Sequence, residues 1–165
     1  MRADIRRLPV AAALACLAVV TGCTGDPERP TLDEAAKQLI SDGDKILASP
    51  ELTTTGSASP TERGDRSSET GCLKGQVQRF FRAHGDLIGP PYIHSPASVV
   101  GAIQSLLRVD GYDKIVDNQD LRDENLSAAV LQNPSTGVTF FVTVRNTQKP
   151  NILIVGKTSC YEQSS

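Results

Sequence analysis

The chain of 165 residues contains no tryptophan, one methionine and two histidines, and its aromatic residues are limited to three tyrosines and four phenylalanines. Sugar-binding sites commonly stack rings on tryptophan or tyrosine, so this composition disfavours a carbohydrate module. Basic charge is not in excess either, because 17 lysine and arginine residues are outnumbered by 19 aspartate and glutamate residues, which gives a formal net charge of −2. Nucleic-acid binding needs a basic surface that neutralises phosphates, so we expect no nucleic-acid partner.

Motifs of common catalytic and nucleotide-binding sites are missing as well. The chain has no G-x-S-x-G elbow, no P-loop, no G-x-G-x-x-G and no HExxH. An acidic stretch over residues 110–124 lacks the ligand order and the glycine of an EF-hand loop, which favours a solvated acidic face over weak calcium binding. We therefore predict no catalytic residue, no metal site and no cofactor, and the sequence names no ligand-binding residue.

The N-terminal segment has the pattern of an export leader. Arginines at positions 2, 6 and 7 precede an apolar run of 13 residues over Leu8–Val20, and small residues follow. This arrangement is typical of a signal peptide. A membrane span needs about 20 residues, so a cleaved leader over 1–22 is favoured over a transmembrane helix. Arg6-Arg7 lacks the residues that usually flank a twin-arginine signal, and the export route, Sec or Tat, stays open.

The leader ends at Val20-Thr21-Gly22-Cys23, which resembles the lipobox of bacterial lipoproteins. The resemblance implies that Cys23 is diacylated on sulfur and becomes the first residue after cleavage, which an ordinary cleaved signal would not provide. The family usually has leucine where this chain has Val20. Two acyl chains give stable anchoring. We therefore expect an extracytoplasmic protein, held on the outer side of the cell membrane by a lipidated tether over 23–30.

Two further cysteines are expected to form a disulfide. With Cys16 removed in the leader and Cys23 acylated, Cys72 and Cys160 remain as a pair. Two cysteines in an oxidising compartment most often bridge. A reactive thiol or a metal pair is the alternative, which the absence of CxxC spacing and of nearby histidines disfavours.

Two amphipathic helices are predicted. Thr31 and Glu34 form a capping box before a helix over residues 32–48, whose apolar positions recur at helical spacing. Ser95-Pro96 begins a second helix that ends near residue 109, before Gly111. The apolar face of each helix is expected to pack on a core.

Residues 49–71 are rich in serine, threonine, glycine and charge and show no apolar period. This composition predicts a flexible loop, either functional or merely tolerated because Cys72 holds its far end. After it we expect a first strand over 72–83, with Arg79 and Arg82 facing solvent, and a turn region over 85–91. Strands are then expected over residues 114–116, 127–132, 138–145 and 152–158.

Short turns between these strands favour antiparallel pairing. The predicted fold is an α+β two-layer sandwich, with two amphipathic helices on one face of a mostly antiparallel sheet of three to five strands. It would form a single domain over residues 31–161, followed by a C-terminal tail over 162–165. A bridge between Cys72 and Cys160 suits neighbouring strands, or a loop that is tied to the end of a strand.

The whole layout resembles small, poorly characterised lipoproteins of actinobacteria. The resemblance rests on the lipobox, an acidic helix, Cys72 before the first strand, a helix introduced by Pro96, and a hairpin that ends near Cys160. It covers most of residues 20–160 and implies a surface-exposed lipoprotein, and it supplies no activity.

Three functions remain open. The favoured one is a non-catalytic envelope lipoprotein that binds a partner protein or a small ligand. If the ligand is apolar, we expect a cleft between the helices and the sheet, lined by residues such as Phe80, Ile103, Leu107 and Phe140. If the partner is a protein, we expect a filled core instead. The alternatives are a structural subunit of an envelope assembly and an enzyme, whose site would combine His84, Asp86, Tyr92 and His94.

Overall fold

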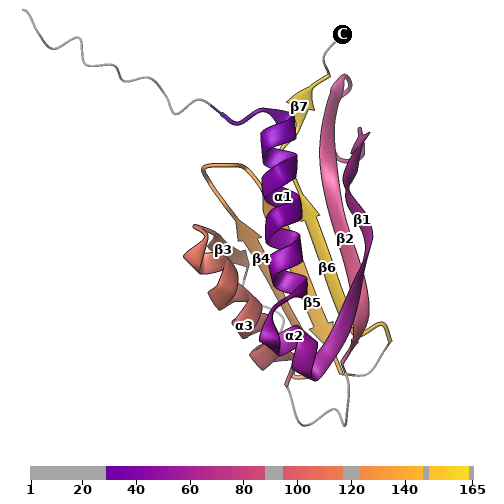
Figure 1. Cartoon of the computed structure of the whole chain (residues 1–165), viewed down its shortest axis with the longest axis vertical. Helices are drawn as coiled ribbons and strands as arrows, with labels where there is room; N and C mark the ends of the chain where they lie inside the picture. Colours follow the sequence, from indigo (N-terminus) through magenta and orange to yellow (C-terminus); the bar gives the residue numbers. More distant parts are fainter. Residues whose placement is uncertain (1–28, 88–94, 117–122, 147–148, 164–165) are drawn as a thin grey trace, which may run out of the picture.

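The computed structural model of the chain describes residues 29–87, 95–116, 123–146 and 149–163. These residues form an α+β fold in which all described strand pairs are antiparallel (Figure 1). The predicted leader, Cys23, and residues 88–94, which include Tyr92 and His94, lie outside this range. The α+β class and the mostly antiparallel sheet are confirmed.

The sheet has seven strands, so the predicted number of three to five is wrong. The strand order is β1-β2-β6-β5-β4-β3, and β7 pairs separately with the start of β2. In chain order the elements are α1 (Leu32–Leu47), α2 (Pro50–Thr55), β1 (Gly56–Ser68), β2 (Gln76–Leu87), α3 (Pro96–Val109), β3 (Asp113–Val116), β4 (Leu126–Gln132), β5 (Thr139–Arg145), β6 (Ile152–Lys157) and β7 (Tyr161–Glu162).

Both predicted helices are confirmed, together with their caps. At the start of α1 the backbone N–H of Glu34 donates to the Thr31 hydroxyl at 3.3 Å, and the backbone N–H of Thr31 donates to the Glu34 carboxylate at 2.8 Å. At the start of α3 the Ser98 N–H donates to Ser95 Oγ at 3.2 Å. The chain leaves α3 through Gly111, whose φ of +86° suits glycine.

The predicted flexible loop over residues 49–71 is wrong. Its first part is α2, capped by Ser49, and most of the rest is the long edge strand β1. Strand β1 pairs with β2 from Gly56↔Leu87 to Ser68↔Gln78, so backbone hydrogen bonds hold it in place. Its side chains are mostly exposed, which leaves no apolar period for sequence analysis to detect.

The limits of β2 also differ from the prediction. The strand begins after a turn in which the Gln76 N–H donates to the Leu73 carbonyl at 3.0 Å, and Gly85–Leu87 continue the strand instead of forming a turn. A side chain at Gly85 would collide with the backbone of Ser57 on β1. Glycine therefore allows the two strands to approach closely here.

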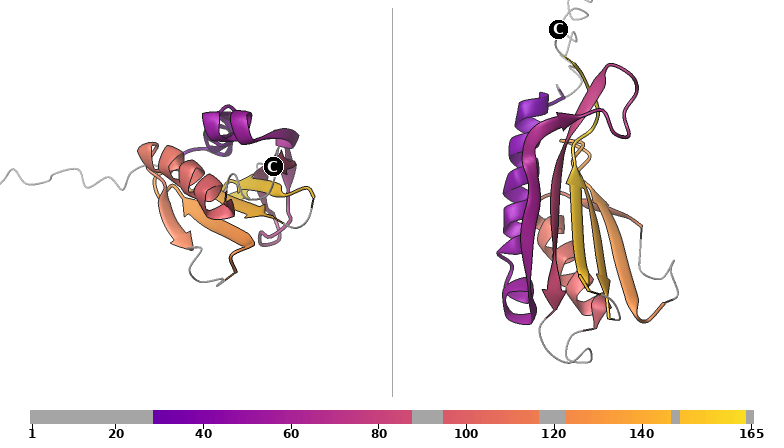
Figure 2. Two further views of the ribbon diagram at one scale, coloured as in Figure 1. Left: turned by 90° about the horizontal axis from the view of Figure 1, so that it is seen from below. Right: turned by 90° about the vertical axis from the view of Figure 1, so that its right-hand side faces the viewer.

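The core lies between the helices and one face of the sheet. Figure 2 shows α1 and α3 on the same side of the strands. Fully buried side chains come from α1 (Leu39), from α3 (Leu107) and from the strands, and the ring of Phe140 packs against Phe81 and Tyr112 at centroid distances of 6.3 and 5.8 Å. Burial of this apolar surface is the main stabilising contribution to the domain.

A buried polar network connects α1 to the segment after α3. Asp42 is completely buried and accepts hydrogen bonds from the Tyr112 hydroxyl at 2.6 Å and from Gln38 Nε2 at 2.8 and 2.9 Å. Above it, Lys45 Nζ lies 3.0 Å from the carboxylate of Asp110. Because a buried carboxylate is stable only when it has donors, these bonds fix α1 relative to the end of α3.

Replacing Tyr112 with phenylalanine removes one of the donors to Asp42. We expect the free energy of unfolding to fall by about 1–3 kcal/mol, because the carboxylate stays buried with a hydrogen bond fewer. Urea unfolding at neutral pH measures this loss. The matched control is Tyr161→Phe at a partly exposed ring, for which we expect a change within about 0.5 kcal/mol. Equal losses in both variants would contradict the role of the Tyr112–Asp42 bond.

The same bond predicts how stability depends on alkaline pH. Burial, and next the hydrogen bond to Asp42, raise the pKa of Tyr112 above its ordinary value of 10.0. Above that pH the unfolded chain loses the phenolic proton while the folded chain keeps it, so the free energy of unfolding decreases as pH rises. Unfolding curves measured from neutral pH to beyond pH 10.0 should therefore decline more steeply for the wild type than for Tyr112→Phe.

Candidate functional site

The predicted disulfide is present. Cys72 lies just before β2 and Cys160 just after β6, and their Cα atoms are 5.7 Å apart with a bond between the sulfurs. The pairing of β2 with β6 brings the two cysteines together, since Phe80 is opposite Lys157. Beyond Lys157 the Thr158 N–H donates to the Arg79 carbonyl at 3.0 Å, which continues the alignment toward Cys160. The bridge leaves neither cysteine as a free thiol or metal ligand.

The predicted histidine site is only partly described. Tyr92 and His94 lie outside the described residues. His84 and Asp86 are two residues apart on the same face of β2, where His84 is exposed and Asp86 lies 3.6 Å from Lys149 Nζ. Over the described ranges, no three acidic, cysteine or histidine side chains are grouped to hold a metal ion.

The space between helices and sheet is filled at three of the four predicted positions. Ile103, Leu107 and Phe140 have exposed fractions of 1% or less and belong to the main core. Phe80 is 6% exposed and lies on the opposite face of the sheet, beneath the guanidinium of Arg82 at 4.4 Å from the ring centroid. These positions therefore line no apolar cleft.

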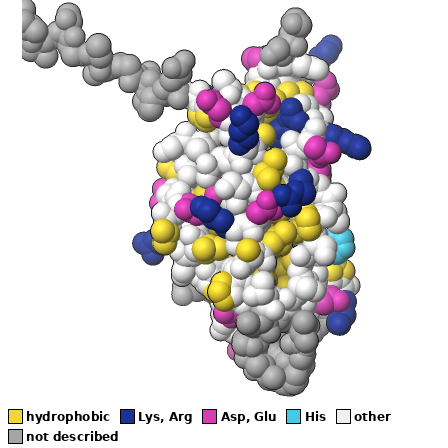
Figure 3. Space-filling view, viewed as in Figure 1, with side chains coloured by type: hydrophobic (Ala, Val, Ile, Leu, Met, Phe, Trp, Pro, Cys, Tyr) yellow, Lys and Arg dark blue, Asp and Glu magenta, His cyan; other side chains and the backbone are white. Residues whose placement is uncertain are grey.

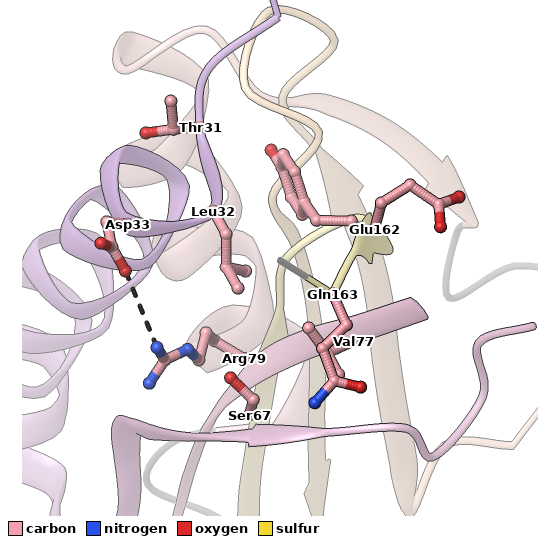
Figure 4. Close-up of a pocket in the computed structure, with 9 residues that line it drawn as sticks. Thr31, Leu32, Asp33, Ser67, Val77, Arg79, Glu162 and Gln163 are labelled. Carbon is pink, nitrogen blue, oxygen red and sulfur yellow. Dashed lines mark ion pairs between the residues drawn. The ribbon is translucent and has the colours of Figure 1, made fainter. Parts of the chain in front are cut away.

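A cleft does occur at the end of the domain where α1 begins (Figure 4). It has a volume of about 600 Å³ and is bounded by the first turn of α1, the end of β1, the start of β2 and the segment around β7. The residues that line it are Thr31, Leu32, Asp33, Ser67, Val77, Arg79, Tyr161, Glu162 and Gln163. Segments more than 80 residues apart meet there because β7 pairs with the first residues of β2.

Arg79 is the main cationic group of this cleft. Its guanidinium donates to the Gly64 carbonyl at 3.2 Å and lies 3.7 Å from the Asp33 carboxylate, as Figure 4 shows for the ion pair. Among the described residues, none accepts a hydrogen bond from its buried Nε. The prediction that Arg79 faces solvent is wrong, because its side chain is only 20% exposed and shares the helix-facing side of β2 with Phe81. Arg82, on the other side, is 42% exposed and lies 2.7 Å from Glu62.

The rest of the cleft combines carboxylates with one aromatic ring. Glu162 accepts a hydrogen bond from Gln76 Nε2 at 2.8 Å, and Asp33 is 80% exposed. Partial burial raises the pKa of Tyr161, so its hydroxyl stays protonated at neutral pH. Hydrogen bonds from Thr31 lower the pKa of Glu34 nearby. The site offers a cationic guanidinium, anionic carboxylates and neutral polar groups. Its nine lining residues include no histidine or cysteine that could act as base or nucleophile.

The second exposed feature is the face of the sheet that points away from the helices, which we name the outer face. Its members alternate with the core residues on the central strands: Arg82 and His84 on β2, Leu153, Val155 and Lys157 on β6, Phe141 and Thr143 on β5, and Ala128 and Val130 on β4. Phe141 follows the core residue Phe140 on β5, so it points to the opposite face of the sheet. In the sequence, the alternation of Leu153 and Val155 with core residues could have indicated that these two side chains of β6 also lie on the outer face.

The cleft, in contrast, was missed by sequence analysis. Its walls come from four separate parts of the chain, and apart from Thr31, which caps α1, none of its residues belongs to a motif. In the described residues, no helix has the length and the apolar character that crossing a bilayer requires. Comparisons with known proteins found no matching family model, no matching curated protein and no matching solved structure.

Removing the disulfide should destabilise the domain strongly. In the Cys72→Ser/Cys160→Ser double variant, the loop between positions 88 residues apart is no longer closed in the unfolded chain. The chain-entropy model predicts a loss of about 4–5 kcal/mol in the free energy of unfolding, measured by denaturant unfolding. Leu73→Ser, at a neighbouring side chain that is 74% exposed, is the control and should change stability little. A double variant as stable as this control would contradict the structural role of the bridge.

Proposed function

We propose that this protein is a lipid-anchored, extracytoplasmic, non-catalytic protein that binds a partner protein at the cell envelope. The disulfide supports the extracytoplasmic part, because such bonds persist in oxidising compartments. Pairing of Cys72 with Cys160 also leaves Cys23 as the cysteine available for acylation after removal of the leader. The sequence Val20-Thr21-Gly22-Cys23 and the resemblance to actinobacterial lipoproteins support the anchor.

The filled interior is the single observation that favours a protein partner over an apolar ligand. Ile103, Leu107 and Phe140 are buried in the core between helices and sheet, whereas Phe141 and Leu153 expose large apolar side chains on the outer face. In this proposal the domain is a two-layer sandwich, with helices over one face of the sheet and the other face available for contact.

Binding of a small polar ligand is the second candidate, and the cleft beside Arg79 supports it. A structural subunit of an envelope assembly is a further alternative and would copurify with fixed stoichiometry. An enzyme that uses His84 and His94 has the least support, because the described part of that site offers one exposed imidazole and a carboxylate already paired with Lys149.

Native mass spectrometry of the protein taken from its own membrane tests this proposal. We expect a chain that begins at Cys23, carries acyl chains and has two hydrogens fewer than the reduced form. Cys23→Ala should abolish acylation and release the protein from the membrane fraction, whereas the control Cys16→Ser, within the leader, should leave both unchanged. A wild-type chain without acyl mass would overturn the anchor. A small adduct that dissociates from the protein on activation in the spectrometer would contradict the protein partner and favour binding of a small ligand.

A further inference from the structure

The outer face carries two rows of side chains that run across four strands. Strand register aligns Arg82, Val155, Phe141 and Val130 in one row. The neighbouring row contains His84, Leu153, Thr143 and Ala128. Side chains directly opposite each other on adjacent strands are in contact range, so the apolar members of these rows form one continuous strip.

This strip is exposed to an unusual degree for the open face of an antiparallel sheet, which is normally polar. Phe141 is 38% exposed and Leu153 is 40% exposed, while Val130 and Val155 beside them are half-buried. On the helix side, by contrast, Figure 3 shows acidic and basic side chains interspersed among small hydrophobic groups. A contiguous apolar patch with a polar rim is typical of an interaction surface.

The charges around the strip are mainly positive. Lys157 Nζ lies 5.6 Å above the ring of Phe141, and within the described ranges no carboxylate pairs with it. Arg82 is half-exposed at the end of one row and pairs with Glu62, while Asp86, two residues beyond the exposed His84 on the same face of β2, pairs with Lys149 at 3.6 Å. The basic rim contrasts with the net charge of −2 for the whole chain. A complementary surface would therefore present carboxylates around an apolar centre.

We propose that the outer face binds a partner protein whose contact surface has an apolar centre and an acidic rim. The inference rests on the proposed function, because it names the site and the chemistry by which the partner is recognised. A second copy of the chain fits less well, since the carboxylates on this face, Glu62 and Asp86, already pair with Arg82 and Lys149 and would have to leave them to reach Lys157 of another copy.

A lipid surface also fits less well, for a geometric reason. The start of α1 lies at one end of the long axis of the domain, whereas the strands that carry the strip run along that axis (Figures 1 and 2). A short tether from the start of α1 brings this end toward the bilayer. The outer face is then directed sideways, toward proteins at the same membrane surface.

Photo-crosslinking in intact membranes tests the proposal with the full, lipidated chain. The probe is p-benzoylphenylalanine, placed at Phe141 in one variant and at Lys37, an exposed position of α1, in the control. We expect one discrete protein adduct from position 141 and none from position 37. The crosslinked peptide of the partner should contain aspartate or glutamate next to apolar residues.

Second substitutions in the position-141 probe variant test whether the strip and its rim hold the partner. Leu153→Ser and Lys157→Glu should each lower the adduct yield about tenfold or more, because they remove the apolar contact and reverse the charge of the rim. Val109→Ser removes an apolar side chain that is 87% exposed outside the outer face and should leave the yield unchanged. Thermal unfolding should show that all three variants remain folded.

Four results would overturn the proposal: no adduct, an adduct with a second copy of the chain, an adduct with lipid, or the same adducts from positions 141 and 37. An adduct that persists in Leu153→Ser and Lys157→Glu would also overturn it. Mass analysis of the same membranes separates this failure from failure of the proposed function. An acylated chain without the adduct would contradict only the docking site on the outer face. A chain without acyl groups would contradict the lipid anchor.

Discussion

The antiparallel pairing of β2 with β6 is the contact on which the rest of the structure depends. It joins the N-terminal part, in which β1 and β2 form a long hairpin, to the meander of β3–β6. The same pairing aligns Cys72 with Cys160 and brings β7 to the start of β2, where the cleft forms. It also makes the rows of the outer face continuous, because β2 supplies their basic ends and β6 and β5 their apolar centre.

The two faces of the sheet differ in how far their side chains are buried and paired. On the helix side, apolar burial is supplemented by the network around Asp42, in which Tyr112 and Gln38 supply the donors that a buried carboxylate requires. On the outer face Phe141 and Leu153 have no such cover within the described chain, and Lys157 only partly shields the aromatic ring. The outer face therefore exposes apolar side chains, and this exposure is the reason for proposing protein contact there instead of catalysis.

Sequence analysis succeeded where the controlling interactions are local. The capping box at Thr31 and Glu34 and the cap at Ser95 predicted the starts of both long helices, and the residue pattern of Val138–Arg145 predicted a strand. It failed for β1, whose exposed polar side chains resemble those of a loop and whose stability comes from backbone pairing with β2. It also misplaced Arg79, because the imperfect alternation of β2 did not reveal which residues face α1.

The amino-acid sequence by itself determined the two helices, most of the strands and the availability of Cys72 and Cys160 for a bridge, since caps, periodicity and residue counts act over short distances along the chain. Only the tertiary structure decided that β6 lies beside β2, that residues 49–71 become ordered, and that Arg79 and Tyr161 share a cleft. These outcomes depend on pairings between segments far apart in sequence. Their free energy comes from the assembled sheet and core, which no local pattern encodes.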